Sequence, residues 1–177
     1  MQKPDSFVVL DTETTGLYDA EPVQIAVLRP DGSTLLDTLV KPTIPVSEGA
    51  ARVHGITEER LKGAPRFSEV YPKLRAVVAD LIIVTYNVAF DQNVINQACH
   101  AASLERLSNV WECAMEAYAE FCGEWSDWHQ SYTWQKLPGG DHSAIGDCRA
   151  ALRIMQKMAG EYRAEWDMNP EQEAVEG

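Results

Sequence analysis

The stretch Phe7-Val8-Val9-Leu10-Asp11-Thr12-Glu13-Thr14-Thr15-Gly16-Leu17 decides the fold of this chain. Its apolar, largely β-branched and aromatic beginning predicts a buried strand over residues 7–10. Because side chains alternate along a strand, Asp11 and Glu13 are expected to point to the same face. Thr14-Thr15-Gly16 then predicts a sharp turn whose backbone amides could meet a ligand.

Working outward, apolar runs and turn signals predict the remaining elements. Further strands are expected over 23–28, 34–40 and 81–84, with a short edge strand at 110–111, and residues 42–49 are expected to form a loop. Helices are expected over 57–61, 67–78, 91–102, 114–121 and 143 to about 162. This order predicts an α/β fold with a mixed central β-sheet flanked by helices. We expect one domain over 1–162 and a flexible acidic tail over 163–177.

Two more motifs carry polar residues at the ends of predicted elements. Asp91 closes Asn87-Val88-Ala89-Phe90-Asp91, which follows the apolar run at 81–84. His142 and Asp147 bracket His142-Ser143-Ala144-Ile145-Gly146-Asp147, where Ser143 is the expected N-cap of the last helix. Open α/β sheets place their ligands at such element ends.

The residue types in these motifs indicate a metal-dependent reaction. Neighbouring carboxylates repel unless a cation lies between them, and ligands made only of oxygen favour Mg²⁺ or Mn²⁺. A loop histidine is suited to act as a base. Taken alone, the Asp11–Glu13 pair could be a solvated strand end, Asp91 a helix cap and His142 polar surface. Together they are the set that a two-metal phosphodiester hydrolase needs.

The motifs resemble those of the DEDD superfamily of 3′–5′ exonucleases, in its histidine-bearing DEDDh branch. This branch includes the proofreading subunit of bacterial DNA polymerase III. Residues 11–16 match Asp-x-Glu-Thr-x-Gly, residues 87–91 match Asn-x-x-Phe-Asp, and residues 142–147 match His-x-Ala-x-x-Asp. Val53-His54-Gly55-Ile56-Thr57 resembles a further family segment near the terminal nucleotide of the substrate.

The resemblance implies a ribonuclease-H-like fold and a two-metal mechanism that releases nucleoside 5′-monophosphates from a 3′ end. Asp11, Glu13 and Asp147 would hold one Mg²⁺ or Mn²⁺ ion, Asp11 would bridge to a second, and Asp91 would support the first through water. His142 would deprotonate the attacking water. The residues expected to bind the substrate are Thr14, Thr15, Leu17, His54 and Asn87. Leu17 would wedge against the terminal base, although a core position is an equal alternative for it.

Three positions depart from the family pattern. Tyr86 stands where the family often has His, Gln24 where it often has Glu, and Gly49 where an acid is common, with Glu48 one residue away. The segment that leads into His142 through Trp134-Gln135-Lys136-Leu137 is also unusual, so the substrate channel there is expected to differ.

Charge and composition limit the substrates and partners. The formal net charge of −12 excludes a broad basic nucleic-acid face, so bound cations or a small contact must provide the attraction. Single-stranded DNA is the expected substrate and RNA ends are the close rival, since recognition of a 2′-hydroxyl needs only one local contact. The alternatives are a non-catalytic binding module and a subunit of a polymerase complex, to which the acidic tail could dock.

The remaining features indicate an ordinary cytoplasmic protein without a membrane segment. The longest apolar runs are far shorter than a membrane span, and residues 1–5 lack the apolar region of a signal peptide. The four cysteines show no Cys-x-x-Cys pair, so buried free thiols are expected rather than disulfides or a zinc site. The Trp-rich segment 111–134 is expected to pack into the core, with base stacking as the minority alternative.

Overall fold

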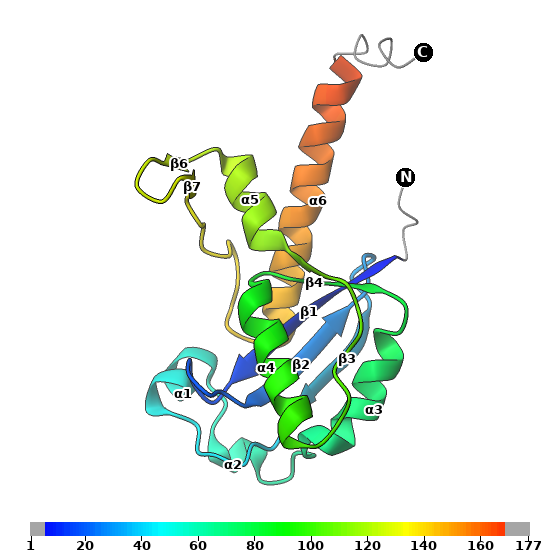
Figure 1. Ribbon diagram of the computed structural model, residues 1–177, viewed down its shortest axis with the longest axis vertical. Coiled ribbons are helices and arrows are strands. Elements are labelled where there is room, and N and C mark those ends of the chain that lie inside the picture. Colours follow the sequence, from blue (N-terminus) through cyan, green and yellow to red (C-terminus); the bar gives the residue numbers. More distant parts are fainter. Residues whose placement is uncertain (1–5, 169–177) are drawn as a thin grey trace.

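A five-stranded mixed sheet with the strand order β3-β2-β1-β4-β5 forms the centre of the molecule (Figure 1). The computed structural model describes residues 6–168, with side chains as far as Glu161. β1 (Phe7–Thr14), β2 (Pro22–Leu28) and β3 (Thr34–Leu39) form an antiparallel meander, and β4 (Ile82–Thr85) and β5 (Trp111–Cys113) continue the sheet in parallel with β1. The predicted mixed sheet is confirmed. β1 extends beyond the predicted strand because residues 11–14 also pair with β2.

Helices cover both faces of the sheet, and the alternation of side chains along β1 assigns each residue to one of them. Val8 and Leu10 pack with α3 (Phe67–Val77) and α4 (Val88–Ala101) in one apolar cluster. Val9 packs on the opposite face against α6 (Ala144–Met168). Odd-numbered positions of β1 therefore face α6, and even-numbered positions face α4.

Two short helices lie between β3 and α3, and one of them was missed. α2 (Glu58–Leu61) begins after Thr57 as predicted. α1 (Glu48–His54) occupies a segment for which no helix was predicted, so the expected loop ends at Ser47. Ser47 caps α1 by accepting a hydrogen bond from the Ala50 backbone amide. α1 has no buried residues, so it lacks the apolar stripe by which a helix is detected in sequence.

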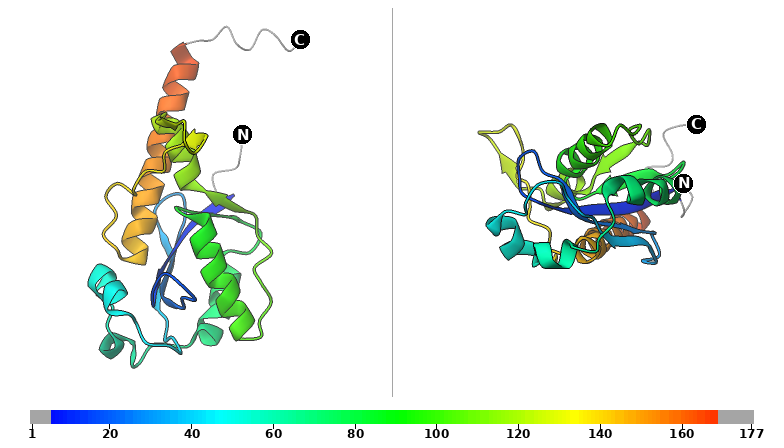
Figure 2. Two further views of the ribbon diagram at one scale, coloured as in Figure 1. Left: turned by 60° about the vertical axis from the view of Figure 1, so that its left-hand side comes forward. Right: turned by 90° about the horizontal axis from the view of Figure 1, so that it is seen from below.

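The last helix is longer than predicted. α6 continues to Met168, past the expected end near Tyr162, and its C-terminal part extends beyond the sheet (Figures 1 and 2). The first strong stop signal is Asn169-Pro170, because a residue before proline disfavours the helical conformation. Part of the predicted tail is therefore helical, and residues 169–177 lie outside the described residues.

α5 (Ala114–Cys122) and a small hairpin of β6 (Trp125–Ser126) and β7 (Ser131–Tyr132) precede α6. The prediction that the tryptophans of this segment pack into the core is wrong for the hairpin. Trp125, Trp128 and Trp134 are all exposed, because a two-stranded hairpin offers no second layer to bury them.

The cysteines and the helix lengths complete the fold. The described structure contains four free cysteines, of which Cys99 and Cys148 are buried as predicted, whereas Cys122 is exposed. Within residues 6–168, none of the helices combines the length and the apolar character needed to cross a membrane.

Candidate active site

The acidic motifs meet where β1 and β4 end side by side. The parallel register pairs Val9 with Val84, so the chain leaves β4 beside Asp11 and enters α4 through Asn87. Parallel neighbours place their carboxyl ends at the same edge of a sheet, which is why these segments, far apart in sequence, converge. The amino end of α6 reaches the same edge from the face of the sheet opposite to α4, because its residues Ala144 and Cys148 pack against Val9.

Three carboxylates form a group suited to a metal ion. One oxygen each of Asp11, Glu13 and Asp147 lies within 4.8 Å of the other two. Asp11 and Glu13 share the odd-numbered face of β1, and Asp147 comes from the first turn of α6, which covers that face. An all-oxygen donor set of this kind fits Mg²⁺ or Mn²⁺.

The electrostatics of the group also favour a bound cation. Burial raises the pKa of Glu13 to about 8, and repulsion from Asp147 and Asp91 adds to the effect. The pKa of Asp11 is raised well above its ordinary value, first by burial and then by repulsion from Asp91, Asp147 and Glu13. A cation would favour the charged forms of these carboxylates and thus reverse both shifts.

Asp91 approaches the group from the other face of the sheet. It is buried in the first turn of α4, and its Oδ1 accepts hydrogen bonds from the Thr12 amide at 3.1 Å and the Thr12 hydroxyl at 2.7 Å. Burial raises its pKa to about 7. Its carboxylate therefore binds Thr12, the residue of β1 that lies between the two acids, while the N-cap position of α4 is taken by Asn87.

The loop before α6 holds His142 over the edge of the sheet. His142 has a left-handed backbone conformation with φ 59°, and its amide donates to Asp147 Oδ1 at 3.2 Å. The Asp141 amide donates to the same oxygen at 2.9 Å. The predicted N-cap is confirmed, because Ser143 Oγ accepts from the Gly146 amide at 3.1 Å. The loop therefore fixes Asp147 and His142 together.

Close packing explains the glycine at position 146. The neighbour at this position is the Asp141 carboxylate. A Cβ on Gly146 would lie 1.9 Å from Asp141 Oδ1. That oxygen also accepts from the Ser143 amide and hydroxyl, at 3.0 and 2.7 Å, so it is not free to move away.

Gly146→Ala is therefore expected to destabilise the protein, although alanine normally favours a helix. We expect a loss of about 1–3 kcal/mol from overpacking and a weaker affinity for divalent ions, because the loop that positions Asp147 must shift. The matched control is Gly160→Ala in the same helix, where a Cβ meets nothing within 4 Å. The control should gain up to about 1 kcal/mol. Chemical denaturation measures both, and a stabilised Gly146→Ala variant would contradict the packing described.

The converging residues line a cavity of about 450 Å³. All five predicted catalytic residues line it, together with the predicted substrate residue Asn87. Sequence reasoning assigned no role to Phe90, Lys136 or Leu137, which also line the cavity. Phe90 belongs to the second motif, so the sequence could have identified it. For Lys136 and Leu137 the only signal in the sequence was the unusual segment before His142.

The other predicted substrate residues lie outside the lining of this cavity. The hydroxyls of Thr14 and Thr15 bind the backbone of the turn, at Gly16 and Glu21. His54 Nε2 lies 3.1 Å from the Thr14 carbonyl oxygen, and burial lowers the pKa of this histidine. Leu17 is 78% exposed, so the core alternative for it is wrong.

Two departures from the family pattern have structural roles. Gln24 Oε1 accepts from the Ala144 amide at 3.2 Å, and its amide donates to Asp37 at 2.8 Å, so it ties β2 to the start of α6. Tyr86 donates its hydroxyl to the Gln135 carbonyl at 2.7 Å and lines the cavity. Both residues therefore support the segment that carries His142.

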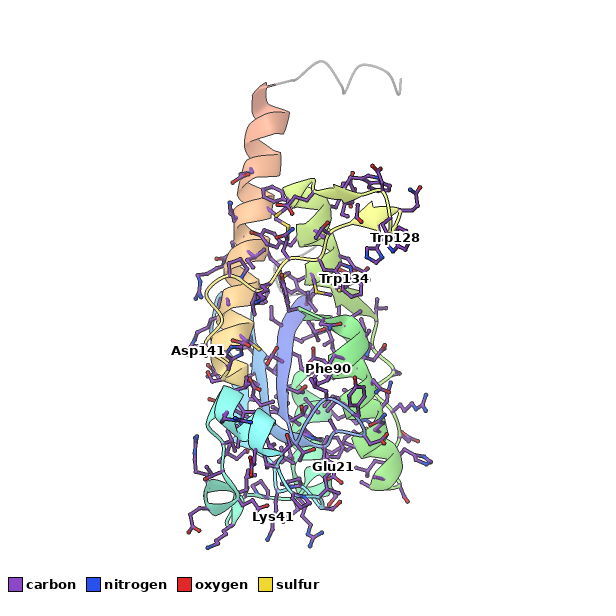
Figure 3. All side chains as sticks on the ribbon, turned by 90° about the vertical axis from the view of Figure 1, so that its left-hand side faces the viewer. Glu21, Lys41, Phe90, Trp128, Trp134 and Asp141 are labelled. Carbon is purple, nitrogen blue, oxygen red and sulfur yellow. The ribbon has the colours of Figure 1, made fainter. Side chains whose placement is uncertain are left out.

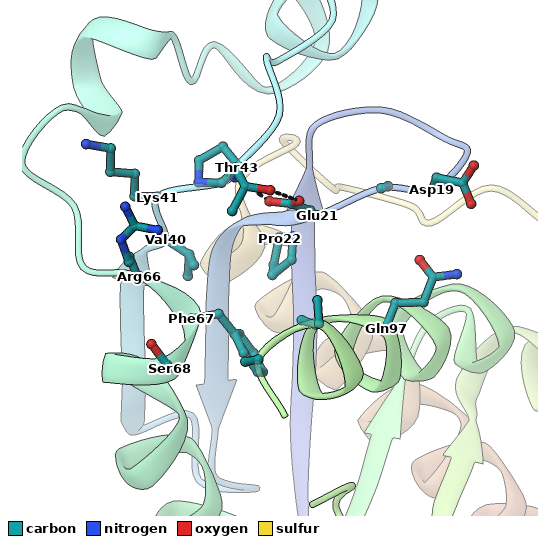
Figure 4. A pocket seen from close by; sticks show the side chains of 15 residues that line it. Asp19, Glu21, Pro22, Val40, Lys41, Thr43, Arg66, Phe67, Ser68 and Gln97 are labelled. Carbon is teal, nitrogen blue, oxygen red and sulfur yellow. Dashed lines mark hydrogen bonds between the residues drawn. The ribbon is translucent and has the colours of Figure 1, made fainter. Parts of the chain in front are cut away.

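A second cavity of about 340 Å³ lies away from the acids, between the β1–β2 turn, the start of α3 and the end of α4 (Figure 4). Phe67 and Ala98 form part of its apolar lining, and at its rim Glu21 accepts hydrogen bonds from Thr43. None of the predicted catalytic residues lines it. The chemistry is therefore assigned to the cavity at the sheet edge.

The mixed sheet with acids at the ends of β1 and β4 defines a nuclease of the ribonuclease-H-like fold. The RNase T exonuclease family model matches residues 8–155, and the chain belongs to this family. The resemblance to DEDDh enzymes is thus confirmed, and the protein is a 3′–5′ exonuclease of the kind that uses divalent metal ions.

Individual relatives agree with this assignment. The chain is 35% identical over 173 residues to the uncharacterized exonuclease CP81 of Escherichia phage 186, covering 88% of this chain and 89% of the relative. It is 32% identical over 163 residues to the PolC-type DNA polymerase III of Bacillus cereus, covering 87% of this chain but only 11% of that protein. The structure of exonuclease X in complex with 5′-overhanging duplex DNA is similar with a TM-score of 0.60 and 29% identity, covering 84% of this chain and 89% of that one.

Proposed function

We propose that this exonuclease removes nucleoside 5′-monophosphates from the 3′ end of single-stranded DNA with two divalent ions and His142 as the general base. The observation that carries the proposal is the meeting of Asp11, Glu13 and Asp147 within 4.8 Å, in one cavity with Asp91 and His142. A non-catalytic binding module is disfavoured, because such a module would have no need for this complete set.

The residues fit the ions that the family uses. Asp11, Glu13 and Asp147 would hold one Mg²⁺ or Mn²⁺ ion, Asp11 would also contact a second, and Asp91 would act indirectly through water. When bound, such ions polarise the scissile phosphate and make water a stronger nucleophile. The indirect role of Asp91 is supported by its hydrogen bonds to Thr12, which occupy Oδ1.

In the reaction itself, one proton would be transferred to a side chain of the protein and one phosphorus–oxygen bond would be broken. His142 is exposed on its loop and lines the cavity, so its ring can reach a water molecule there. It would take the proton as the water oxygen attacks the phosphorus atom. The bond from phosphorus to the 3′ oxygen of the preceding nucleotide breaks, and that oxygen acquires a proton from solvent. The products are a 5′-monophosphate and a strand with a new 3′-hydroxyl.

Two exposed side chains on the turn after β1 support the choice of substrate. Leu17 and Tyr18 are 78% and 90% exposed on the turn after β1, where they could separate or stack on terminal bases. The duplex end bound by exonuclease X makes a recessed 3′ end the second substrate to test. RNA remains the third, because recognition of a 2′-hydroxyl needs only one local contact. The predicted polymerase partner draws support from the PolC-type relative, and the predicted cytoplasmic location stays a prediction.

The raised pKa values predict how pH affects the metal-free protein. In the folded state Glu13 and Asp91 titrate near 8 and 7, above their ordinary values near 4, so the folded state binds more protons than the unfolded chain between these limits. Stability should therefore fall as the pH rises from about 5 to 8. Mg²⁺ should restore more stability at pH 8 than at pH 5.

Thermal unfolding with EDTA or Mg²⁺ at the two pH values measures this. Glu13→Gln removes one of the titrating groups and should flatten the profile of the metal-free protein. Metal-free stability that rises over this range, or an equal effect of Mg²⁺ at both pH values, would contradict the electrostatic description of the site.

The substrate and the products can be tested together. The protein is incubated with Mg²⁺ and single-stranded DNA, 5′-overhanging duplex DNA or RNA of matched sequence, and the released nucleotides are separated by chromatography. We expect 5′-monophosphates, formed fastest from single-stranded DNA. Nucleoside 3′-monophosphates would exclude the proposed bond cleavage, and a faster reaction with RNA or duplex DNA would overturn the substrate choice.

A further inference from the structure

Exposed tryptophans gather on the hairpin that follows α5 in the chain. This aromatic hairpin, residues 124–135, contains Trp125, Trp128 and Trp134, whose exposed fractions are 53%, 89% and 67%. Large aromatic side chains are normally buried to a considerable extent, and exposed ones that cluster mark binding surfaces. The tryptophans are therefore available to a ligand.

The aromatic hairpin is held by its own contacts. Trp125 pairs with Tyr132 across the two strands, and their rings meet edge to face at 5.3 Å. The Thr133 amide donates to the Glu124 carbonyl at 2.7 Å, and Gln130 closes the turn through the Asp127 carbonyl. Trp128 and Trp134 are thus presented by a folded element, which lowers the ordering cost when a ligand binds.

The aromatic hairpin is continuous with the catalytic cavity. The backbone carbonyl of its last residue, Gln135, accepts a hydrogen bond from the Tyr86 hydroxyl. The next two residues, Lys136 and Leu137, line the cavity. Figure 3 shows Trp128 and Trp134 above Phe90, on one side of the molecule, and Phe90 also lines the cavity. A strand whose 3′ end enters the cavity can therefore continue over the hairpin.

The acidic charge of the aromatic hairpin favours contacts with bases over contacts with phosphate groups. Glu124 and Asp127 lie on it, and the whole chain carries a net charge of −12, so phosphate groups are not attracted there. Bases stack on aromatic rings without needing a positive surface, and stacking tolerates any base sequence. Stacking therefore suits this surface better than backbone recognition does.

We propose that the aromatic hairpin is a stacking platform for unpaired bases upstream of the 3′-terminal nucleotide, with Trp128 and Trp134 as its main contacts. The proposal rests on the proposed function and refines it, because bases must be unpaired to stack there. Single-stranded nucleic acid is then the preferred substrate class. A protein partner on the same tryptophans is the competing outcome.

The test compares Trp128→Ala/Trp134→Ala with Trp128→Phe/Trp134→Phe, which keeps aromatic faces. The control is Val110→Ala, at an exposed apolar position outside the lining of the catalytic cavity. Binding of a fluorescent 20-nucleotide strand is measured by anisotropy in EDTA, and kcat/KM with Mg²⁺ is measured for the 20-mer and a dinucleotide. We expect the alanine variant to lose roughly tenfold in affinity and in kcat/KM for each tryptophan removed, on the 20-mer only. The phenylalanine and control variants should retain most of both.

The outcomes separate this proposal from the proposed function. Weaker binding by the alanine variant, in a protein that hydrolyses neither strand, would support the platform and overturn the exonuclease mechanism. Hydrolysis of the 20-mer with equal kcat/KM and affinity in all variants would overturn the platform and favour a protein partner. An equal loss on the dinucleotide would also overturn it, because the hairpin would then act through the cavity itself. The fold-loss should persist between 50 and 200 mM salt, as expected for stacking rather than phosphate contacts.

Discussion

Asp11→Asn is expected to abolish exonuclease turnover and at the same time to stabilise the metal-free protein. The carboxylate would contact both proposed ions, so we expect kcat to fall by about 10³-fold or more. The same carboxylate is half-buried near Glu13, Asp91 and Asp147. Loss of hydration and then repulsion from these three acids raise its pKa, so its charged form is costly when no cation is present. An amide of the same shape removes that cost.

Both effects are measurable on one preparation. The stability gain should be about 1 kcal/mol, which corresponds to roughly 2–4 °C in the Tm measured in EDTA. Mg²⁺ should no longer raise the Tm to the wild-type extent. Glu112→Gln, at an exposed position on β5, is the control and should change neither quantity. Retained activity, or a metal-free variant less stable than the wild type, would contradict the role of Asp11.

His142→Asn should reduce kcat by about 10²–10⁴-fold while leaving metal binding intact. Asparagine is chosen because it tolerates the left-handed backbone conformation that His142 adopts at φ 59°. The His142 amide would still donate to Asp147, so the carboxylate group should keep its arrangement. The loss should therefore appear in turnover and not in the stabilisation by Mg²⁺.

His100→Asn provides the control, because His100 is exposed at the far end of α4. Its kcat should match that of the wild type. Normal turnover in His142→Asn would exclude a general-base role. A loss of turnover accompanied by a loss of Mg²⁺ stabilisation would instead assign His142 to metal binding or to the shape of the loop.

The sheet and its main helices could be predicted because each has a local signal. The run at residues 7–10 alternates between two apolar clusters, and the stripe from Phe67 to Val77 packs on one of them. The acidic motifs were recognisable for a related reason, since every one lies directly after a buried strand or at a helix start. At these points the local sequence pattern also marks where the residue lies in the folded sheet.

Other features depend on contacts that no local pattern carries. α1 buries none of its residues, so it leaves no apolar periodicity in the sequence. The closeness of Asp141 to Gly146 follows from the path of one loop, and a glycine alone does not indicate its neighbour. The exposure of Trp128 and Trp134 is equally invisible, because composition cannot distinguish a core tryptophan from one on a hairpin. Roles for Thr14, Thr15 and His54 came from family resemblance, and their side chains bind or contact the backbone of the protein itself.

The most direct test of the central claim uses one single-stranded oligonucleotide labelled at either end. With Mg²⁺ or Mn²⁺, a 5′ label should remain on a ladder of strands that shorten one nucleotide at a time, while a 3′ label should leave at once as a mononucleotide. EDTA should stop both reactions, and Asp11→Asn should show neither. Shortening from the 5′ end, or cleavage that continues in EDTA, would contradict a metal-dependent 3′–5′ exonuclease built on Asp11, Glu13 and Asp147.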